Sequence, residues 1–140
     1  MEKTVILSPC GILGYGFPEK SLWDAMEQHP DAIIVDAGST DAGPHKLGAG
    51  VAIVSRKAAK IDLSRLMHAA HGAGIPLLIG SAGGSGARKH TDWTLDIIEE
   101  IAREMNWKAR IAVIYADIPY EDIRRARGEG RIEKMSPNVP

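Results

Sequence analysis

The fold is decided by the stretch Leu77-Leu78-Ile79-Gly80-Ser81-Ala82-Gly83-Gly84-Ser85-Gly86-Ala87-Arg88-Lys89-His90, in which an apolar run passes directly into a loop of glycine and small polar residues. The same arrangement occurs twice earlier, where Val5–Leu7 leads into residues 8–16 and Ile33–Val35 leads into residues 36–45. Parallel strands of one sheet release the loops that follow them at a single edge, where open α/β sheets bind ligands. The sequence therefore predicts a binding site built from three glycine-rich loops.

Four apolar runs are continuous rather than alternating, which is typical of strands buried on both faces. They are Val5–Leu7, Ala32–Val35, Leu77–Ile79 and Ile111–Tyr115. This pattern, with helical segments between the runs, predicts an α/β fold: an open, mostly parallel sheet of four or more strands, in the order 2-1-3-4, with helices on both faces.

Helix signals lie between these runs. The expected helices are one over 19–28, one capped by Asp62 and stopped by Gly72 or Gly74, one capped by Thr91 and continuing to Met105, and a short polar one that starts at 117–119 and ends at Gly128 or Gly130. Residues 42–60 are long for a connection, and 51–54 are expected to form an extra strand or a loop segment packed under the site.

Length and composition limit the classes of function that the chain can have. A chain of 140 residues predicts one α/β domain over 1–133, with 134–140 as a tail or linker to an absent region. The 17 Lys and Arg residues balance 18 Asp and Glu residues, so no basic surface is expected to draw the chain to nucleic acid or to a membrane. The lone Cys10 cannot form an internal disulfide, and the start of the chain lacks a signal-peptide pattern, which predicts a cytoplasmic location.

Two carboxylates and a histidine are the catalytic candidates. Asp36 and Asp41 follow the second apolar run, and His45 lies in the same loop. Carboxylates at a strand end can bind a metal, act as a general base or hold a ribose hydroxyl. The structural alternative is that both aspartates accept loop N–H groups as Asx turns.

The glycine loops are predicted to cradle an anion, because glycine lets backbone N–H groups approach a ligand closely. Arg88, Lys89 and His90 follow the third loop as charge partners. The alternative is a connection whose basic residues are simply solvated. Nucleotide binding is less favoured, because neither a dinucleotide fingerprint nor a P-loop is present. The predicted ligand-binding residues are Gly11, Gly38, Ser39, Thr40, Ser81, Gly83, Gly84, Ser85, Gly86, Arg88 and His90.

Other reactive side chains have simpler interpretations. Cys10 stands where a nucleophile could stand, but without a base nearby in the sequence a small packing residue is the favoured interpretation. His68 and His71 have a spacing that could bind a metal, but the dipole of a helix C-terminus also favours histidines there. We therefore predict no metal site, and the sequence specifies no cofactor.

Four loop strings occur in a characteristic order: Gly-Ile-Leu-Gly-Tyr-Gly-Phe-Pro at 11–18, Val-Asp-Ala-Gly-Ser-Thr-Asp-Ala-Gly-Pro at 35–44, Leu-Ile-Gly-Ser-Ala-Gly-Gly at 78–84 and Asp-Trp-Thr-Leu at 92–95. With them, residues 5–133 resemble the N-terminal part of the acyclic terpene utilisation (AtuA-like) proteins. Members of that family are larger, and some are linked to the catabolism of acyclic terpenes through CoA thioesters. The resemblance implies an acyl-CoA or carboxylate ligand and supplies no set of catalytic residues.

Two functions follow as expectations. The first is an enzyme domain that binds a small anionic metabolite, of carboxylate or acyl-CoA type, at the carboxyl edge of the sheet. The alternative is a non-catalytic ligand-binding or assembly domain. Trp23, Trp93 and Trp107 are many indoles for a domain of this size, so the chain is expected to form a homo-oligomer or to pack against a missing domain.

Overall fold

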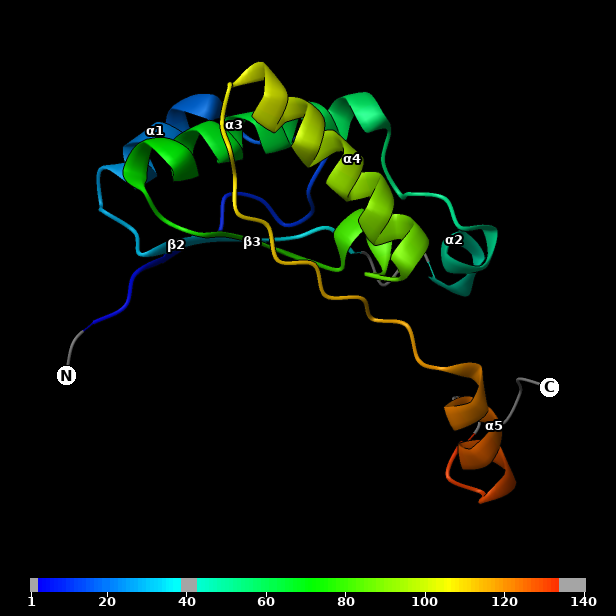
Figure 1. The fold of residues 1–140 in the computed structure, drawn as a ribbon. Coiled ribbons are helices and arrows are strands. Elements are labelled where there is room, and N and C mark those ends of the chain that lie inside the picture. Colours follow the sequence, from blue (N-terminus) through cyan, green and yellow to red (C-terminus); the bar gives the residue numbers. More distant parts are fainter. Residues whose placement is uncertain (1–2, 39–42, 134–140) are drawn as a thin grey trace.

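The computed structural model describes residues 3–38 and 43–133, which form an α/β fold around one parallel sheet (Figure 1). Its strands are β1 (Ile6–Leu7), β2 (Ala32–Asp36) and β3 (Leu77–Gly80). The helices are α1 (Glu19–Met26), α2 (Gly43–Ala49), α3 (Arg56–Ala73), α4 (Arg88–Glu104) and α5 (Tyr120–Gly128), with a short 3-10 turn, η2 (Ala82–Gly84). The predicted α/β class and parallel pairing are confirmed; the predicted tail, 134–140, lies outside the described residues.

The strand order corrects the prediction. Among the described residues the sheet has three strands in the order β1-β2-β3, so the second strand is central and the order 2-1-3-4 is wrong for these strands. β2 is central because it pairs with β1 along one edge and with β3 along the other, and its Ile33 and Val35 are 0% and 2% exposed in the core.

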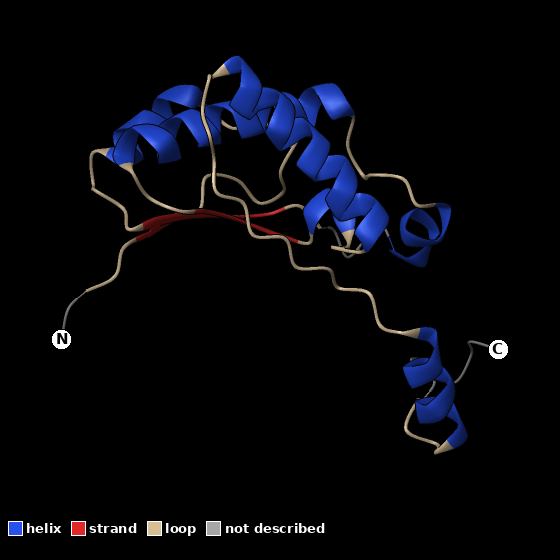
Figure 2. Cartoon of the chain, in the orientation of Figure 1, coloured by secondary structure: helices blue, strands red, loops and turns tan. Residues whose placement is uncertain are grey.

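The helix layer follows from that order. When consecutive strands are added in one direction, right-handed crossovers place every connecting helix on the same face of the sheet. Figure 2 shows this arrangement, with α1, α3 and α4 on one side of the strands. The expectation of helices packed on both faces is therefore wrong for the described part of the chain.

The two faces of the sheet differ accordingly. Leu7 stands opposite Ile33, and Ile33 opposite Leu77, and these side chains pack in the core with Val35 and Ile79. Alternate residues point to the other face. There Ile6, Ile34 and Leu78 are 49%, 37% and 47% exposed. One apolar face of the sheet is thus left open.

The fourth predicted strand, Ile111–Tyr115, is extended chain and not a strand. Among the described residues, the hydrogen bonds recorded for this stretch do not join it to β3. Its apolar side chains remain exposed, and Ile114 reaches 87%. An apolar run has strand propensity, but only pairing with a neighbour makes it part of a sheet.

The helix boundaries differ from the sequence signals at two places. The N-cap of α3 is Ser55, whose Oγ accepts the Ala58 N–H at 3.2 Å, and Asp62 lies buried in the middle of the helix. Helix α4 begins at Arg88, before Thr91, whose hydroxyl donates to the Gly86 carbonyl. In the long connection, 43–49 form the unpredicted helix α2, and 51–54 form a loop.

Helices α3 and α4 are joined by an ion network. Arg56 and Lys60 of α3 each lie 2.6 Å from Glu100 of α4, and Lys60 also reaches Glu104 at 2.6 Å. The hydrogen bond from Lys60, with that from Arg56, lowers the pKa of the Glu100 carboxyl from its ordinary value of 4.5 to about 2.

This lowered pKa gives a pH-dependent prediction. A carboxyl whose pKa is depressed by folding contributes stability that is complete above the unfolded pKa and is lost as the pH falls through the folded pKa. We expect the difference in unfolding free energy between wild type and Glu100→Gln to shrink from about pH 5 to pH 2. Urea denaturation of both proteins across that range measures it, and a difference independent of pH would contradict the network.

Candidate functional site

The second and third glycine loops meet at the carboxyl ends of β2 and β3. A Cβ atom on Gly38 would lie 2.7 Å from the Cβ of Ser81, so the two loops are in contact there. Asp36 Oδ1 accepts the Gly38 N–H at 3.0 Å, which is the bond of an Asx turn. The structural alternative for Asp36 is therefore realised in its own loop. The predicted residues Ser39, Thr40 and Asp41 lie outside the described residues.

Two backbone N–H groups of the first glycine loop donate to a side chain of the protein. Asp62 Oδ2 accepts the N–H groups of Gly14 at 2.8 Å and Gly16 at 3.0 Å. The Asp62 side chain is 2% exposed, so this carboxylate occupies the position that an external anion would take. The predicted residue Gly11 is exposed on the same loop and has no neighbour that a Cβ would touch.

The third loop packs against the first turn of α4. Gly83 has a φ of +70°, and a Cβ there would lie 2.4 Å from the carbonyl oxygen of His90. This close backbone approach explains why glycine is needed at that position. Gly84 and Gly86 continue the same loop, and Ser81 starts it. The loop thus fixes the position of His90.

His90 carries the least satisfied buried polar atom of the described residues. Its side chain is 2% exposed, and Nδ1 lies 2.7 Å from Ser85 Oγ, which also accepts the Ala87 N–H at 3.2 Å. The other ring nitrogen, Nε2, is buried and has no hydrogen-bond partner within 3–38 and 43–133. Such an atom costs about 1–3 kcal/mol when left unpaired.

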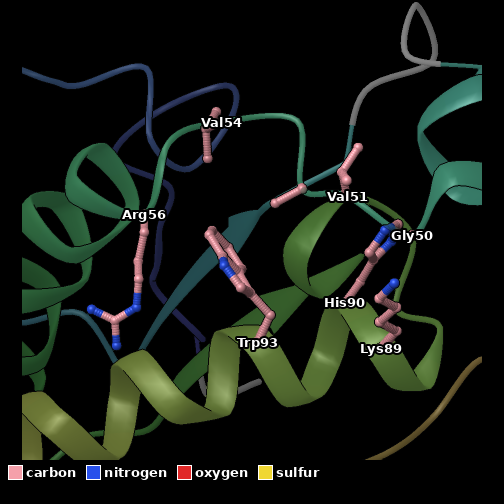
Figure 3. A pocket seen from close by; sticks show the side chains of 8 residues that line it. Gly50, Val51, Val54, Arg56, Lys89, His90 and Trp93 are labelled. Carbon is pink, nitrogen blue, oxygen red and sulfur yellow. The ribbon is translucent and has the colours of Figure 1, made fainter.

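His90 borders a cavity of about 310 Å³ between the first turns of α4 and the loop that joins α2 to α3. Figure 3 shows the side chains of His90 and Lys89 pointing toward Gly50 and Val51, whereas Arg56 turns away. Arg56 is bound to Glu100, but no ion pair is recorded for Lys89 in the described part of the chain. The cavity is therefore lined by Lys89, for which no ion pair is found, and by His90, whose Nε2 lacks a partner among the described residues.

Two predicted residues, Arg88 and His45, do not line this cavity, and Cys10 is a packing residue. The Arg88 guanidinium lies 3.9 Å from the centre of the Tyr115 ring, and its backbone N–H donates to Asp117. His45 is exposed on α2. Burial, and then the Asp62 carboxylate, raise the pKa of the Cys10 thiol, and Cys10 packs against the core. A raised pKa opposes formation of a nucleophilic thiolate.

No family model, curated protein or solved structure matches the chain. Within 3–38 and 43–133, no group of three or more His, Cys, Asp or Glu side chains could hold a metal ion. In the same described ranges, none of the helices combines the length and the apolar character needed to cross a bilayer.

Sequence reasoning missed parts of this arrangement. It treated Asp62 as a helix cap, although apolar residues stand three positions before it (Ala59) and four after it (Leu66) on the same helix face, which is a signal for a buried carboxylate with partners. It also gave no role to Gly50 or Trp93 as lining residues. The sequence predicts Lys89 as a charge partner beside the third loop, and the structure adds the cavity that Lys89 lines.

Proposed function

We propose that this chain is an enzyme domain that binds a small anionic metabolite, of carboxylate or acyl-CoA type, at the carboxyl edge of the sheet. The observations that carry the proposal are the buried, unpaired Nε2 of His90 and the cavity that His90 lines together with Lys89. A ligand oxygen would supply the missing hydrogen bond and would meet a cation at the same place.

The contact with Ser85 supports this choice of ligand. When the Ser85 hydroxyl donates to Nδ1, the ring proton is on Nε2, which then donates to the ligand. The same hydroxyl oxygen accepts the Ala87 N–H, so its orientation is held by the backbone that precedes α4. An imidazole N–H donor beside an ammonium group suits a carboxylate or phosphate oxygen.

The cavity size limits what enters it. A volume of about 310 Å³ lies at the lower end of the roughly 300–1,000 Å³ range of small-molecule sites. The cavity accommodates the anionic head group of such a metabolite. The remainder of an acyl-CoA would extend out of the cavity along the glycine loops. Because Nε2 is buried, the side chains that cover it must shift before a ligand oxygen can reach it.

We assign catalysis to the segment that follows β2. In this proposal Asp36 and Asp41 serve as acid or base groups and His45 as a further polar group. Asp36 lies at the end of the central strand beside Gly80, where a carboxylate can reach a ligand at the sheet edge. The resemblance to AtuA-like proteins favours a carboxylate or CoA thioester as the substrate class.

Ligand binding tests the proposal directly. We expect inorganic phosphate, short-chain carboxylates or CoA thioesters to raise the melting temperature, since a ligand at a hundredfold excess over its Kd stabilises a fold by roughly 2.7 kcal/mol. Lys89→Gln should weaken binding about tenfold or more, because it removes a charge-assisted contact. Isothermal titration calorimetry measures the affinities.

Matched variants locate the ligand. Lys57→Gln removes an exposed charge from α3 and should leave the affinity unchanged. Arg88→Ala should also leave it nearly unchanged, because the guanidinium is stacked on Tyr115. Equal affinities of wild type and Lys89→Gln, or a loss confined to Arg88→Ala, would place the anion elsewhere and contradict the proposal.

A specific observation favours the alternative function, an assembly domain. The open sheet face exposes Ile6, Ile34 and Leu78, which are large apolar residues on neighbouring strands. Exposed patches of this kind mark interaction surfaces. If no anion of the panel shifts the melt and light scattering shows an oligomer, this function replaces the first.

A further inference from the structure

A groove of about 1130 Å³ separates β3 from the extended chain over 108–114. It exceeds the roughly 300–1,000 Å³ of small-molecule sites, and much of its wall is made by these two extended segments. It is a different surface from the cavity beside Lys89.

The extended chain is fixed at both ends. At one end the Trp107 N–H donates to the Ala102 carbonyl at 2.8 Å, and its ring stacks on His71. At the other end the Tyr115 hydroxyl donates to Asp92 at 2.8 Å and the Ala116 N–H donates to Gly86 at 2.9 Å. No backbone hydrogen bond is recorded for 108–114 within the described ranges.

Strand β3 offers unused backbone groups toward the groove. The carbonyls of Pro76 and Gly80 accept from Ile33 and Ala37 of the central strand. Because bonding residues alternate along a parallel strand, Leu77 and Ile79 direct their N–H and C=O groups to the opposite side. Two strand-like segments therefore flank an unfilled space, both with unpaired backbone.

Direction and charge define what fits this space. The extended chain starts near the end of α3 and finishes beside Gly86, so it runs parallel to β3. The charged residues that line the groove are basic: Lys108 and Arg110, at the end where β3 begins, with His71 beside them; no acidic side chain of the described residues lines it.

We infer that the groove accepts a β-strand of a different protein, inserted in parallel between β3 and 108–114, with acidic residues at its N-terminal end beside Lys108 and Arg110. Strand addition supplies main-chain hydrogen bonds to both flanking segments, and side-chain charge sets the register. Apolar side chains at alternate positions would face the helix layer.

The test uses the synthetic peptide Asp-Asp-Val-Thr-Ile-Thr-Val-Thr and the whole chain, with affinity measured by calorimetry. We expect saturable binding that is weakened about tenfold or more when alternate peptide amides are N-methylated, because these amides can no longer donate to the flanking segment that they face. Amide exchange should slow at Leu77 and Ile79. Equal binding of the N-methylated peptide, or none of either, would overturn the inference.

Reversing the charge of the two basic residues at the groove provides a second test. The double variant Lys108→Glu, Arg110→Glu should reverse the preference, so that a peptide beginning Lys-Lys binds better than the one beginning Asp-Asp. Both side chains are exposed, so the variant should fold. An unchanged preference would overturn the assigned register. A dimer that excludes the peptide would identify a second copy of this chain as the occupant and overturn the inference.

Discussion

Asp62→Ala is expected to lower the unfolding free energy by roughly 3–5 kcal/mol, because two N–H groups of the first glycine loop lose a charged acceptor. Asp62 is 2% exposed, and its Oδ2 receives Gly14 at 2.8 Å and Gly16 at 3.0 Å. Alanine would also leave a small cavity under the loop. Urea denaturation followed by circular dichroism measures the loss.

Two control variants test whether the loss of stability comes from the missing hydrogen-bond acceptor. One keeps an acceptor without the charge, and the other removes an exposed aspartate from a helix. Asp62→Asn keeps an acceptor oxygen and should lose clearly less stability than Asp62→Ala. Asp96→Ala, on the exposed side of α4, should remain within about 0.5 kcal/mol of wild type. If Asp62→Ala were as stable as Asp96→Ala, the carboxylate would not hold the loop.

Gly83→Ala is expected to cost roughly 2–5 kcal/mol. Alanine at a φ of +70° is strained by about 1–2 kcal/mol, and crowding of a packed interior costs about 1–3 kcal/mol more. The added Cβ would meet backbone at 2.4 Å and 2.8 Å, the carbonyl oxygen and carbon of His90, so the loop or the helix must move. Thermal and urea denaturation measure the effect.

The matched control is Gly72→Ala. Gly72 lies in α3 with no atom within 4 Å of an added Cβ, so alanine there should stabilise the chain by about 0.5–1 kcal/mol. If the unfolding free energy falls for Gly83→Ala and rises for Gly72→Ala, the cost at Gly83 comes from its backbone geometry. Equal effects would mean that the third loop does not pack on α4 as described.

The sequence was sufficient to predict the fold class and the parallel strands. Val5–Leu7, Ile33–Val35 and Leu77–Ile79 are continuous apolar runs, and periodic helices separate them. The strand order could not be predicted, because Ile34 and Leu78 have the character of residues buried on both faces and yet one side of the sheet is open. An apolar residue indicates that burial is favoured, but its identity does not determine which element covers it.

The sequence indicated where to look for the candidate site but not which contacts its residues make. The glycine loops indicated the edge where β2 and β3 end, and His90 was among the predicted residues. That the donors of the first loop serve Asp62, and that Arg88 stacks on Tyr115 while Lys89 faces the cavity, depends on contacts between segments distant in sequence. Residue type and spacing do not determine such contacts.

The strand order also has a consequence for the route by which the chain folds. Each strand pairs with the one that precedes it, and every crossover lies on the same side, so pairing can proceed in the order in which residues leave the ribosome. Each step closes one crossover only, which keeps the entropy lost in loop closure small. On this route β3 would pair last, and among the described residues its outer edge is where a further strand would be added.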